Sequence, residues 1–377
     1  MTSHHRPSPL PGVLRPFGPA FEAVYRFELG RRSRAFDRGK GVIELDRPVV
    51  SVGNLSVGGT GKTPMVRRMV RALRDAGHDP AIAMRGYASS NGLSDEADEY
   101  RRSLDDVPVV AQPNRAQGLL DLFATQRGER IDCVVLDDGF QHRKLARCFD
   151  VVLIDSTRDP FADHLLPRGW LREGPDALGR AHAVAITRAD AVDAARVREI
   201  ASKARQINPA LLVAAYRHAW LAMRVHEFAA GSIAIREESV AWARGKRFGV
   251  ACAIANPDAL LGMVRGALGE PIGSVILPDH DAYDAPALKR VIELSHASEV
   301  LLVTDKDWSK LARVRPELWG CPVVVPRVEM EPMPGVFDGE SSSLDALENA
   351  AISAIRAFRA AHPQAAADHG PQESPHP

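Results

Sequence analysis

The chain has 377 residues, equal numbers of acidic and basic side chains, and an ordinary apolar content. A single hydrophobic core rarely grows to this length, so we expect two domains with tails. The zero net charge disfavours a general nucleic-acid-binding protein, because affinity for a phosphate backbone needs a basic excess. The four cysteines lack Cys-x-x-Cys spacing and indicate buried thiols in a reducing cytosol.

The N-terminal region carries no targeting pattern. No run of eighteen apolar residues occurs, and residues 1–12 are rich in His and Pro without an apolar segment. We therefore expect neither a membrane-spanning helix nor a signal peptide, and we predict a protein that stays on the cytoplasmic side. Residues 1–12 are predicted to be disordered.

Residues 19–38 are predicted to form an amphipathic helix. Phe21, Val24 and Phe27 lie toward one side, while arginines such as Arg31 and Arg34 surround and follow them. Aromatic side chains on one face with cations around it are typical of a helix that lies in a membrane interface. A helix that packs on the protein's own core, with its arginines in water, fits the pattern equally well.

The stretch 51–64, Ser-Val-Gly-Asn-Leu-Ser-Val-Gly-Gly-Thr-Gly-Lys-Thr-Pro, carries the strongest functional signal. An apolar strand at 48–50 precedes it, and helical apolar spacing at 65–73 follows. In that context, backbone N–H groups and the positive end of a helix point at one small volume. We predict that a nucleoside triphosphate binds there, on Ser56, Val57, Gly58, Gly59, Thr60, Gly61, Lys62 and Thr63.

Two side chains of this loop have specific predicted roles. Lys62 can reach the outer phosphates, and the Thr63 hydroxyl can hold a magnesium ion that bridges them. Ser56 stands where the usual pattern has its first glycine, so the loop is a variant. The alternative is a glycine-rich turn with an incidental Gly-Lys-Thr.

Apolar runs alternate with helical patterns along the rest of the chain, which indicates a parallel sheet covered on both faces. An acidic loop is expected at 91–99. Strands are expected at 79–87, 107–110, 131–138, 151–155 and 183–187, then at 246–254, 300–304 and 323–326, with helices at 116–125, 258–268, 285–295 and 344–361.

The predicted fold is therefore a P-loop NTPase-like α/β core with a second, smaller α/β domain and the N-terminal amphipathic helix. The expected divisions are 1–40 for the disordered start and helix, 41–210 for the nucleotide-binding domain, 211–245 for an extended ribbon or linker, 246–335 for the smaller domain, and 336–377 for a largely disordered tail.

The strand at 131–138 ends in two acids, which is the form of a Walker B element. A carboxylate of Asp137 or Asp138 can complete the oxygen shell of a magnesium ion whose other ligands come from phosphate. Strand ends often carry Asp as a simple turn former. Together with the loop at Lys62, however, the pair indicates a metal-nucleotide site.

These segments resemble the tetraacyldisaccharide 4'-kinases, enzymes of lipid A biosynthesis. The matching stretches include 53–64, Arg-Gly-Tyr at 85–87, Asp-Glu at 95–96, Asp-Asp-Gly-Phe-Gln-His at 137–142, Asn-Pro at 256–257, Pro-Asp-His at 278–280 and Thr-Asp-Lys-Asp at 304–307. They occur in the family's order and cover residues 48–326. The chain departs from the family around Asp95, which lacks the usual preceding Gly and following Pro.

The resemblance implies ATP-dependent phosphorylation of the 4'-hydroxyl of a tetraacylated disaccharide, with Mg²⁺ as cofactor. It also implies that Asp95 and His280 form a dyad that takes the proton from the attacking hydroxyl, next to Lys62. A carboxylate can accept that proton and an imidazole can orient it. Without the resemblance, Asp95 would be interpreted as a solvated acid in a loop, and His280 would be interpreted equally well as a cap of the following helix.

Five further residues are candidates of lower rank. The resemblance suggests a magnesium role for Glu173, although Glu173 could instead pair with an arginine. Arg85, Arg115 and Arg172 could clamp phosphates of substrate or nucleotide, because guanidinium matches phosphate bidentately. His142 is assigned to substrate binding, with packing beneath the loop as the alternative.

Three functions compete. The first is a lipid kinase, peripheral on the cytoplasmic face of the inner membrane, which reaches its acylated substrate through the N-terminal helix without an obligate protein partner. An acylated sugar leaves a bilayer only at about 0.8 kcal/mol per buried CH₂, so the enzyme must go to it. The second is a P-loop ATPase or GTPase switch, and the third a kinase of a soluble metabolite. The sequence at 304–307 has the wrong order for guanine recognition.

Overall fold

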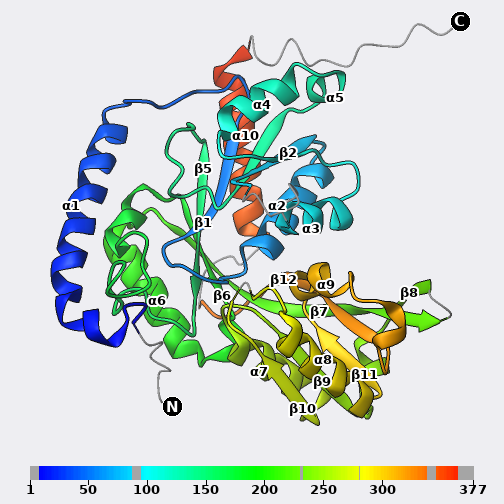
Figure 1. Cartoon of the computed structure of the whole chain (residues 1–377). Coiled ribbons are helices and arrows are strands. Elements are labelled where there is room, and N and C mark those ends of the chain that lie inside the picture. The colour runs from blue at the N-terminus through cyan, green and yellow to red at the C-terminus, as the bar shows by residue number, and fades with distance from the viewer. Residues whose placement is uncertain (1–7, 87–94, 230–231, 280, 338–344, 364–377) are drawn as a thin grey trace, which may run out of the picture. The chain divides into compact units, whose positions relative to one another are not determined.

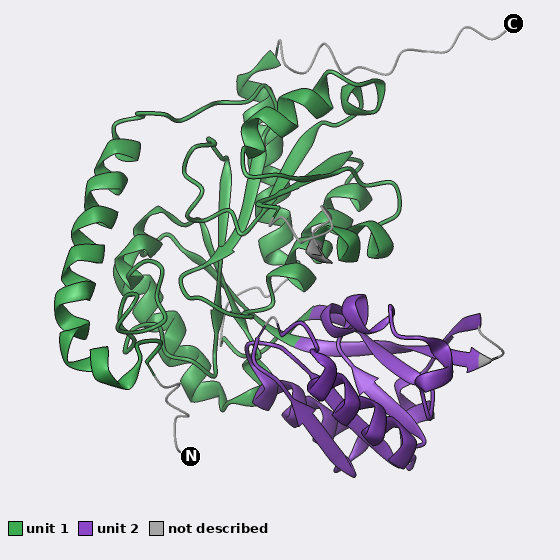
Figure 2. Cartoon of the chain, viewed as in Figure 1, with its two compact units in different colours: residues 1–217, 331–377 green, residues 218–330 purple. Residues whose placement is uncertain are grey.

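The structure is a computed structural model that describes residues 8–86, 95–229, 232–279, 281–337 and 345–363, with residues 95, 96 and 229 described by their backbone (Figure 1). By compactness the chain divides into two units (Figure 2). Unit 1 comprises residues 1–217 and 331–377, and unit 2 comprises residues 218–330.

Unit 1 is built on a parallel sheet in the order β3-β2-β4-β1-β5-β6-β7. Its strands are β1 (Val49–Asn54), β2 (Pro80–Met84), β3 (Val109–Ala111), β4 (Cys133–Asp137), β5 (Phe149–Asp155), β6 (Ala183–Thr187) and the start of β7 (Leu212–Ala229). Every residue of β1, β2, β4, β5 and β6 is buried. Strands buried on both faces need continuous apolar sequence, which is why they were predictable.

The helices of unit 1 pack on this sheet and extend beside it. They are α1 (Gly18–Asp37), α2 (Lys62–Asp75), α3 (Asp95–Ser103), α4 (Arg115–Phe123), α5 (Gln126–Glu129), α6 (Ala194–Ile207) and α10 (Ala346–Ala361). Two hydrophobic clusters fill the spaces between helices and strands, one around Val152, Ile154 and Ile200 and one around Leu119, Val134 and Leu136. Among the described residues, no helix combines the length and apolar character needed to cross a bilayer.

Unit 2 has strands in the order β10-β9-β11-β12-β7, with β8 paired antiparallel to β7. The bounds are β8 (Ser232–Glu238), β9 (Phe248–Cys252), β10 (Gly273–Ile276), β11 (Val300–Val303) and β12 (Val323–Pro332), with helices α7 (Pro257–Leu268), α8 (Ala285–Ala297) and α9 (Asp305–Leu311). Asn256, Asp284 and Thr304 cap these helices by accepting hydrogen bonds from backbone N–H groups of the first turn.

The α/β fold with an N-terminal helix is confirmed, and three local expectations need comment. The acidic loop expected at 91–99 is wrong for residues 95–99, which belong to α3, because Ala97 and Tyr100 of α3 and the following Leu104 form a buried stripe; residues 91–94 lie outside the described part. The disorder predicted for residues 1–12 does not extend to Leu10, which is buried, and residues 1–7 lie outside the described part. Residues 211–245 contain the paired strands β7 and β8.

Candidate active site

The predicted phosphate loop lies between β1 and α2, at the carboxyl end of a central strand. Gly61 caps α2 at φ 92°, a left-handed backbone conformation that residues other than glycine rarely adopt. Gly53 lets β1 approach the next loop closely, since a Cβ there would lie 2.6 Å from the Cβ of Phe140. Both glycines are therefore required by the backbone path of the site.

Contacts within unit 1 hold this loop in place. The Asn54 side-chain amide donates to the Thr60 hydroxyl at 3.0 Å, and the Thr187 hydroxyl donates to the Thr60 carbonyl at 2.9 Å. Arg188 donates to the Gly59 carbonyl at 3.0 Å and pairs with Asp155. The loop is thus positioned by the ends of β1, β5 and β6, as expected for a ligand site at the carboxyl edge of a parallel sheet.

Lys62 lies between an amide and a carboxylate. Its ammonium is 3.4 Å from the Asn54 side-chain oxygen and 3.4 Å from the Asp138 carboxylate, and its side chain is 17% exposed. A lysine at the first position of α2, directed toward the end of β4, can place its charge where the outer phosphates of a nucleotide would lie.

Asp138 is surrounded by cations. Arg172 donates to both of its carboxylate oxygens, at 2.9 and 2.7 Å, and Arg115 donates to its backbone carbonyl at 3.2 Å. Burial alone would raise the pKa of Asp138, but the charges of Lys62, Arg172 and Arg115 outweigh it and lower the pKa to about 2. Asp138 is therefore ionised at any physiological pH, and it brings three predicted site residues together.

Asp137 faces a different environment. It is 5% exposed, and its carboxylate accepts a hydrogen bond from the Tyr100 hydroxyl at 3.0 Å. The Thr63 side chain lies next to the same hydroxyl. A carboxylate and a hydroxyl thus meet at one point beside the loop, which is the hard oxygen donor set that Mg²⁺ prefers.

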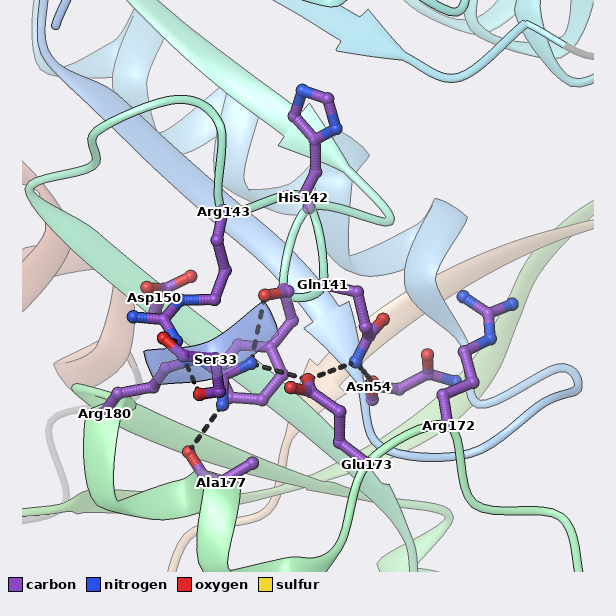
Figure 3. A network of polar contacts seen from close by, with 12 residues as sticks. Ser33, Asn54, Gln141, His142, Arg143, Asp150, Arg172, Glu173, Ala177 and Arg180 are labelled. Carbon is purple, nitrogen blue, oxygen red and sulfur yellow. Dashed lines mark hydrogen bonds and ion pairs between the residues drawn. The ribbon is translucent and has the colours of Figure 1, made fainter. Parts of the chain in front are cut away.

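The carboxylate of Glu173 is engaged within the protein (Figure 3). Its Oε2 accepts from Gln141 at 3.0 Å and from Arg180 at 2.6 Å, while Gln141 also donates to the Asn54 carbonyl at 2.9 Å. The Arg180 guanidinium lies 3.7 Å over the Phe140 ring. These contacts favour the alternative for Glu173, in which it pairs with an arginine and supports the loop.

His142 lies among cations at the same edge of the sheet. Burial lowers the pKa of His142, and the charges of Arg115, Arg147, Lys144 and Arg85 lower it further, to about 4. A neutral imidazole could donate a hydrogen bond to a phosphate but could not form an ion pair with it. Arg85 follows β2 and is exposed, whereas Arg115 opens α4 and is buried.

The predicted dyad falls largely outside the described atoms. Asp95 is the first residue of α3, its side chain is not described, and His280 lies outside the described residues. The preceding Asp279 pairs with Lys306 at 2.8 Å within unit 2. The dyad therefore stays a prediction.

Several residues at the site were missed from sequence. Tyr100, Thr187 and Arg188 contact the loop or its neighbours but lie outside every predicted motif, and Asn54 lies within the stretch 51–64 without a predicted role of its own. For Tyr100 a signal existed, because Ala97, Tyr100 and Leu104 have the three- and four-residue spacing of a buried helical stripe. The other three are ordinary polar residues at strand ends.

Comparisons with known proteins agree on one family. The family model described as tetraacyldisaccharide-1-P 4'-kinase matches residues 13–338. A protein of Anaeromyxobacter dehalogenans (strain 2CP-C) named tetraacyldisaccharide 4'-kinase is 33% identical over 352 residues, which make up 88% of this chain and 90% of that protein. A Parabacteroides distasonis protein of the same name is 28% identical over 320 residues, covering 79% and 84%.

A solved structure supports the fold. The crystal structure of LpxK from Aquifex aeolicus in complex with ATP matches with a TM-score of 0.61 at 23% identity, covering 91% of this chain and 99% of that chain. At this level of identity the match shows the shared architecture of the two proteins.

Proposed function

This chain belongs to the tetraacyldisaccharide-1-P 4'-kinase family, and from that premise we propose that it transfers the γ-phosphate of ATP to the 4'-hydroxyl of a tetraacylated disaccharide, a lipid A precursor, giving lipid IVA. The observation that carries the proposal is the position of Lys62 at the start of α2, with its ammonium 3.4 Å from Asp138 at the end of β4. A glycine-rich loop, a lysine and a carboxylate at that junction are the parts that phosphoryl transfer requires.

In the proposed complex, residues 56–63 surround the phosphates and Lys62 offsets their charge. Asp138 holds Lys62 and Arg172 beside the loop, so these cations are already gathered where the triphosphate would enter. Electrostatic stabilisation of this kind is effective because the donors are fixed before the reaction. Arg115, through the Asp138 carbonyl, belongs to the same assembly.

We assign a magnesium ion to Thr63 and Asp137. Both supply oxygen ligands, and both contact one hydroxyl, so they fit a small hard cation. When bound, the ion would act as a Lewis acid and offset the negative charge that develops on the transferred phosphate. Asp138 already has two cationic partners, and Glu173 has an arginine and a glutamine.

The proton of the acceptor hydroxyl is assigned to Asp95, with His280 as the group that orients it. As the new bond from sugar oxygen to phosphorus forms, the bond from phosphorus to the β,γ-bridging oxygen breaks and ADP leaves, while the proton passes to the carboxylate. A sugar hydroxyl is a weak nucleophile, so a base within hydrogen-bond reach is needed.

The acylated acceptor requires a membrane surface, and α1 is the proposed docking element. On this helix Val24 and Phe27 are 69% and 68% exposed, and just before it Val13 and Phe17 are 82% and 58% exposed. An exposed apolar face with arginines on the same helix suits the boundary between headgroups and acyl chains. We place the protein on the cytoplasmic face of the inner membrane on this basis.

The transfer assay tests the function. ATP labelled at the γ-phosphate is incubated with the protein and a tetraacyl disaccharide 1-phosphate, beside a reaction without lipid. We expect label in the lipid, its loss in Lys62→Met, and in Asp95→Ala a rate that falls far more than ATP affinity does. Equal losses in rate and affinity for Asp95→Ala would contradict the base assignment. Lipid-independent release of labelled phosphate without transfer would favour the ATPase or GTPase switch.

A further inference from the structure

Tyr100 joins two of the residues that the proposed function places on a metal ion. It lies on α3, it is 0% exposed, and its hydroxyl is 3.0 Å from the Asp137 carboxylate. The Thr63 side chain, at the start of α2, lies next to this hydroxyl. The phenol oxygen is therefore hydrogen-bonded to the end of β4 and lies beside the phosphate loop.

The direction of the hydrogen bond between Tyr100 and Asp137 follows from the donors available. An ionised carboxylate only accepts, so the single phenol hydrogen goes to Asp137. The neighbouring Thr63 hydroxyl can then turn its own hydrogen toward the phenol oxygen, which leaves the lone pairs of the Thr63 oxygen for another partner.

Packing between helices fixes the phenol in this place. Glu99, next to Tyr100 on α3, pairs with Arg67 of α2 at 3.1 Å, and their side chains are 16% and 7% exposed. Ala97 of α3 and Leu104, directly after the helix, are buried as well. The position of the hydroxyl is thus set by the contact of α3 with α2, before any ligand binds.

We infer that Tyr100 is a positioning residue for the divalent cation of the nucleotide site, and that it ties cation binding to α3. The inference rests on the proposed function, which supplies the cation. Tyr100 orients the Thr63 oxygen and one side of the Asp137 carboxylate, so that the two ligands are arranged before the ion arrives. Preorganised ligands bind a metal more tightly than ligands that must first be ordered.

Tyr100 also connects the proposed cation site to the rest of α3. It lies five residues after Asp95, the first residue of α3, which is about 7.5 Å along a helix. A cation that fixes Asp137 should therefore also steady α3 through the hydrogen bond of Tyr100 to Asp137.

The test measures cation binding without turnover. Mn²⁺ replaces Mg²⁺ as a paramagnetic probe, a non-hydrolysable ATP analogue is present, and bound Mn²⁺ is followed by electron paramagnetic resonance. The variants are Tyr100→Phe and the matched control Tyr216→Phe, which removes the hydroxyl of another fully buried tyrosine. The Tyr216 hydroxyl contacts Glu348 at 3.3 Å instead of a predicted cation ligand.

We expect Tyr100→Phe to bind Mn²⁺ in the nucleotide complex about tenfold more weakly, as for one lost hydrogen bond to a charged group. Its affinity for the analogue in EDTA should match that of the unaltered protein, and Tyr216→Phe should bind Mn²⁺ normally. Unchanged Mn²⁺ affinity in Tyr100→Phe, or an equal loss in Tyr216→Phe, would overturn the inference. An unaltered protein that binds no Mn²⁺ with the analogue would instead overturn the proposed function.

A second variant covers the case in which Tyr100→Phe does not fold. Replacing Tyr100 by 4-aminophenylalanine keeps a hydrogen-bond donor at the ring's end and should retain most of the Mn²⁺ affinity. Hydrogen exchange of α3 amides should slow when Mg²⁺ and the analogue bind the unaltered protein. Exchange in α3 that does not respond to the metal complex would contradict the link between cation and helix.

Discussion

Asp137 and Asp138 are neighbours in the sequence with separate tasks in the structure. Asp138 adopts φ 51°, which turns its carboxylate toward Lys62 and Arg172, while Asp137 ends β4 and binds Tyr100. The sequence predicted an acidic pair at the end of a strand. It could not predict how the pair divides, because the division depends on a left-handed residue and on partners more than thirty positions away.

At the scale of single residues, the pKa of His142 also predicts how the stability of the protein depends on pH. Its folded pKa of about 4 lies below the ordinary value of 6.5, so between these values the unfolded chain binds a proton that the folded protein does not. The free energy of unfolding should therefore fall as pH drops through that window, by about 1 kcal/mol after allowance for solvent screening.

Urea unfolding at pH 4.5 and pH 7 measures this effect. His142→Asn should lose the His142 part of the pH dependence, whereas the exposed His362→Asn should keep it. If both variants retain the full difference in the free energy of unfolding between pH 4.5 and pH 7, His142 does not titrate as its surroundings require.

At the scale of elements, α1 answers a question that the sequence left open. Of the two interpretations of its pattern, core packing holds for one face, and membrane contact stays a prediction for the exposed face. Tyr25 and Leu29 pack against the core of unit 1, and the Tyr25 hydroxyl donates to the Arg172 carbonyl at 3.1 Å. The opposite face carries the exposed Val24 and Phe27.

Charging that exposed face should weaken membrane binding and leave the fold intact. Val24→Asp with Phe27→Asp places two charges on side chains that lie in water already, so the melting temperature should change little. Co-sedimentation with vesicles that contain anionic lipid should fall several-fold. Ile235→Asp, at a 62% exposed site in unit 2, is the control that should bind vesicles normally. Equal vesicle binding by all three proteins would leave α1 without a role at the membrane.

The C-terminal helix α10 is stabilised by burial, although the sequence predicts it only weakly. The sequence predicted a weak helix at 344–361, and α10 forms at Ala346–Ala361 because Leu347, Ala351 and Ile355 are buried in unit 1. Its Glu348 is 1% exposed and pairs with Arg68 of α2. Helices α1 and α10 both show that contacts between residues distant in sequence, rather than local helix propensity, determine where a helix of this kind is held.

Removing the Glu348 carboxylate should therefore destabilise unit 1. Glu348→Ala leaves Arg68 and the Tyr216 hydroxyl without that partner, and the expected loss is about 3 kcal/mol in the free energy of unfolding. Glu348→Gln keeps the shape and some hydrogen bonding and should lose less. Denaturant unfolding that ranks the two variants equally would show that the charge of Glu348 contributes nothing.

For the whole molecule, the sequence predicted two α/β parts because each has its own apolar strands. Unit 2 has a separate core in which Phe228, Trp308 and Trp319 contact one another. β10 was not predicted, since it has only four residues and is partly exposed. The expected domain limits at residues 210, 246 and 335 stay predictions, and so does the pairing of Asp95 with His280.

At the scale of the whole molecule, the most direct test of the proposed function is whether phosphate goes to the 4'-hydroxyl of the acceptor. Transfer of labelled γ-phosphate is measured to the tetraacyl disaccharide 1-phosphate and, in parallel, to its 4'-deoxy analogue in the same vesicles. A 4'-kinase must label the first and leave the second unlabelled. Equal labelling of both lipids, or release of free phosphate with no labelled lipid in either, would contradict the account.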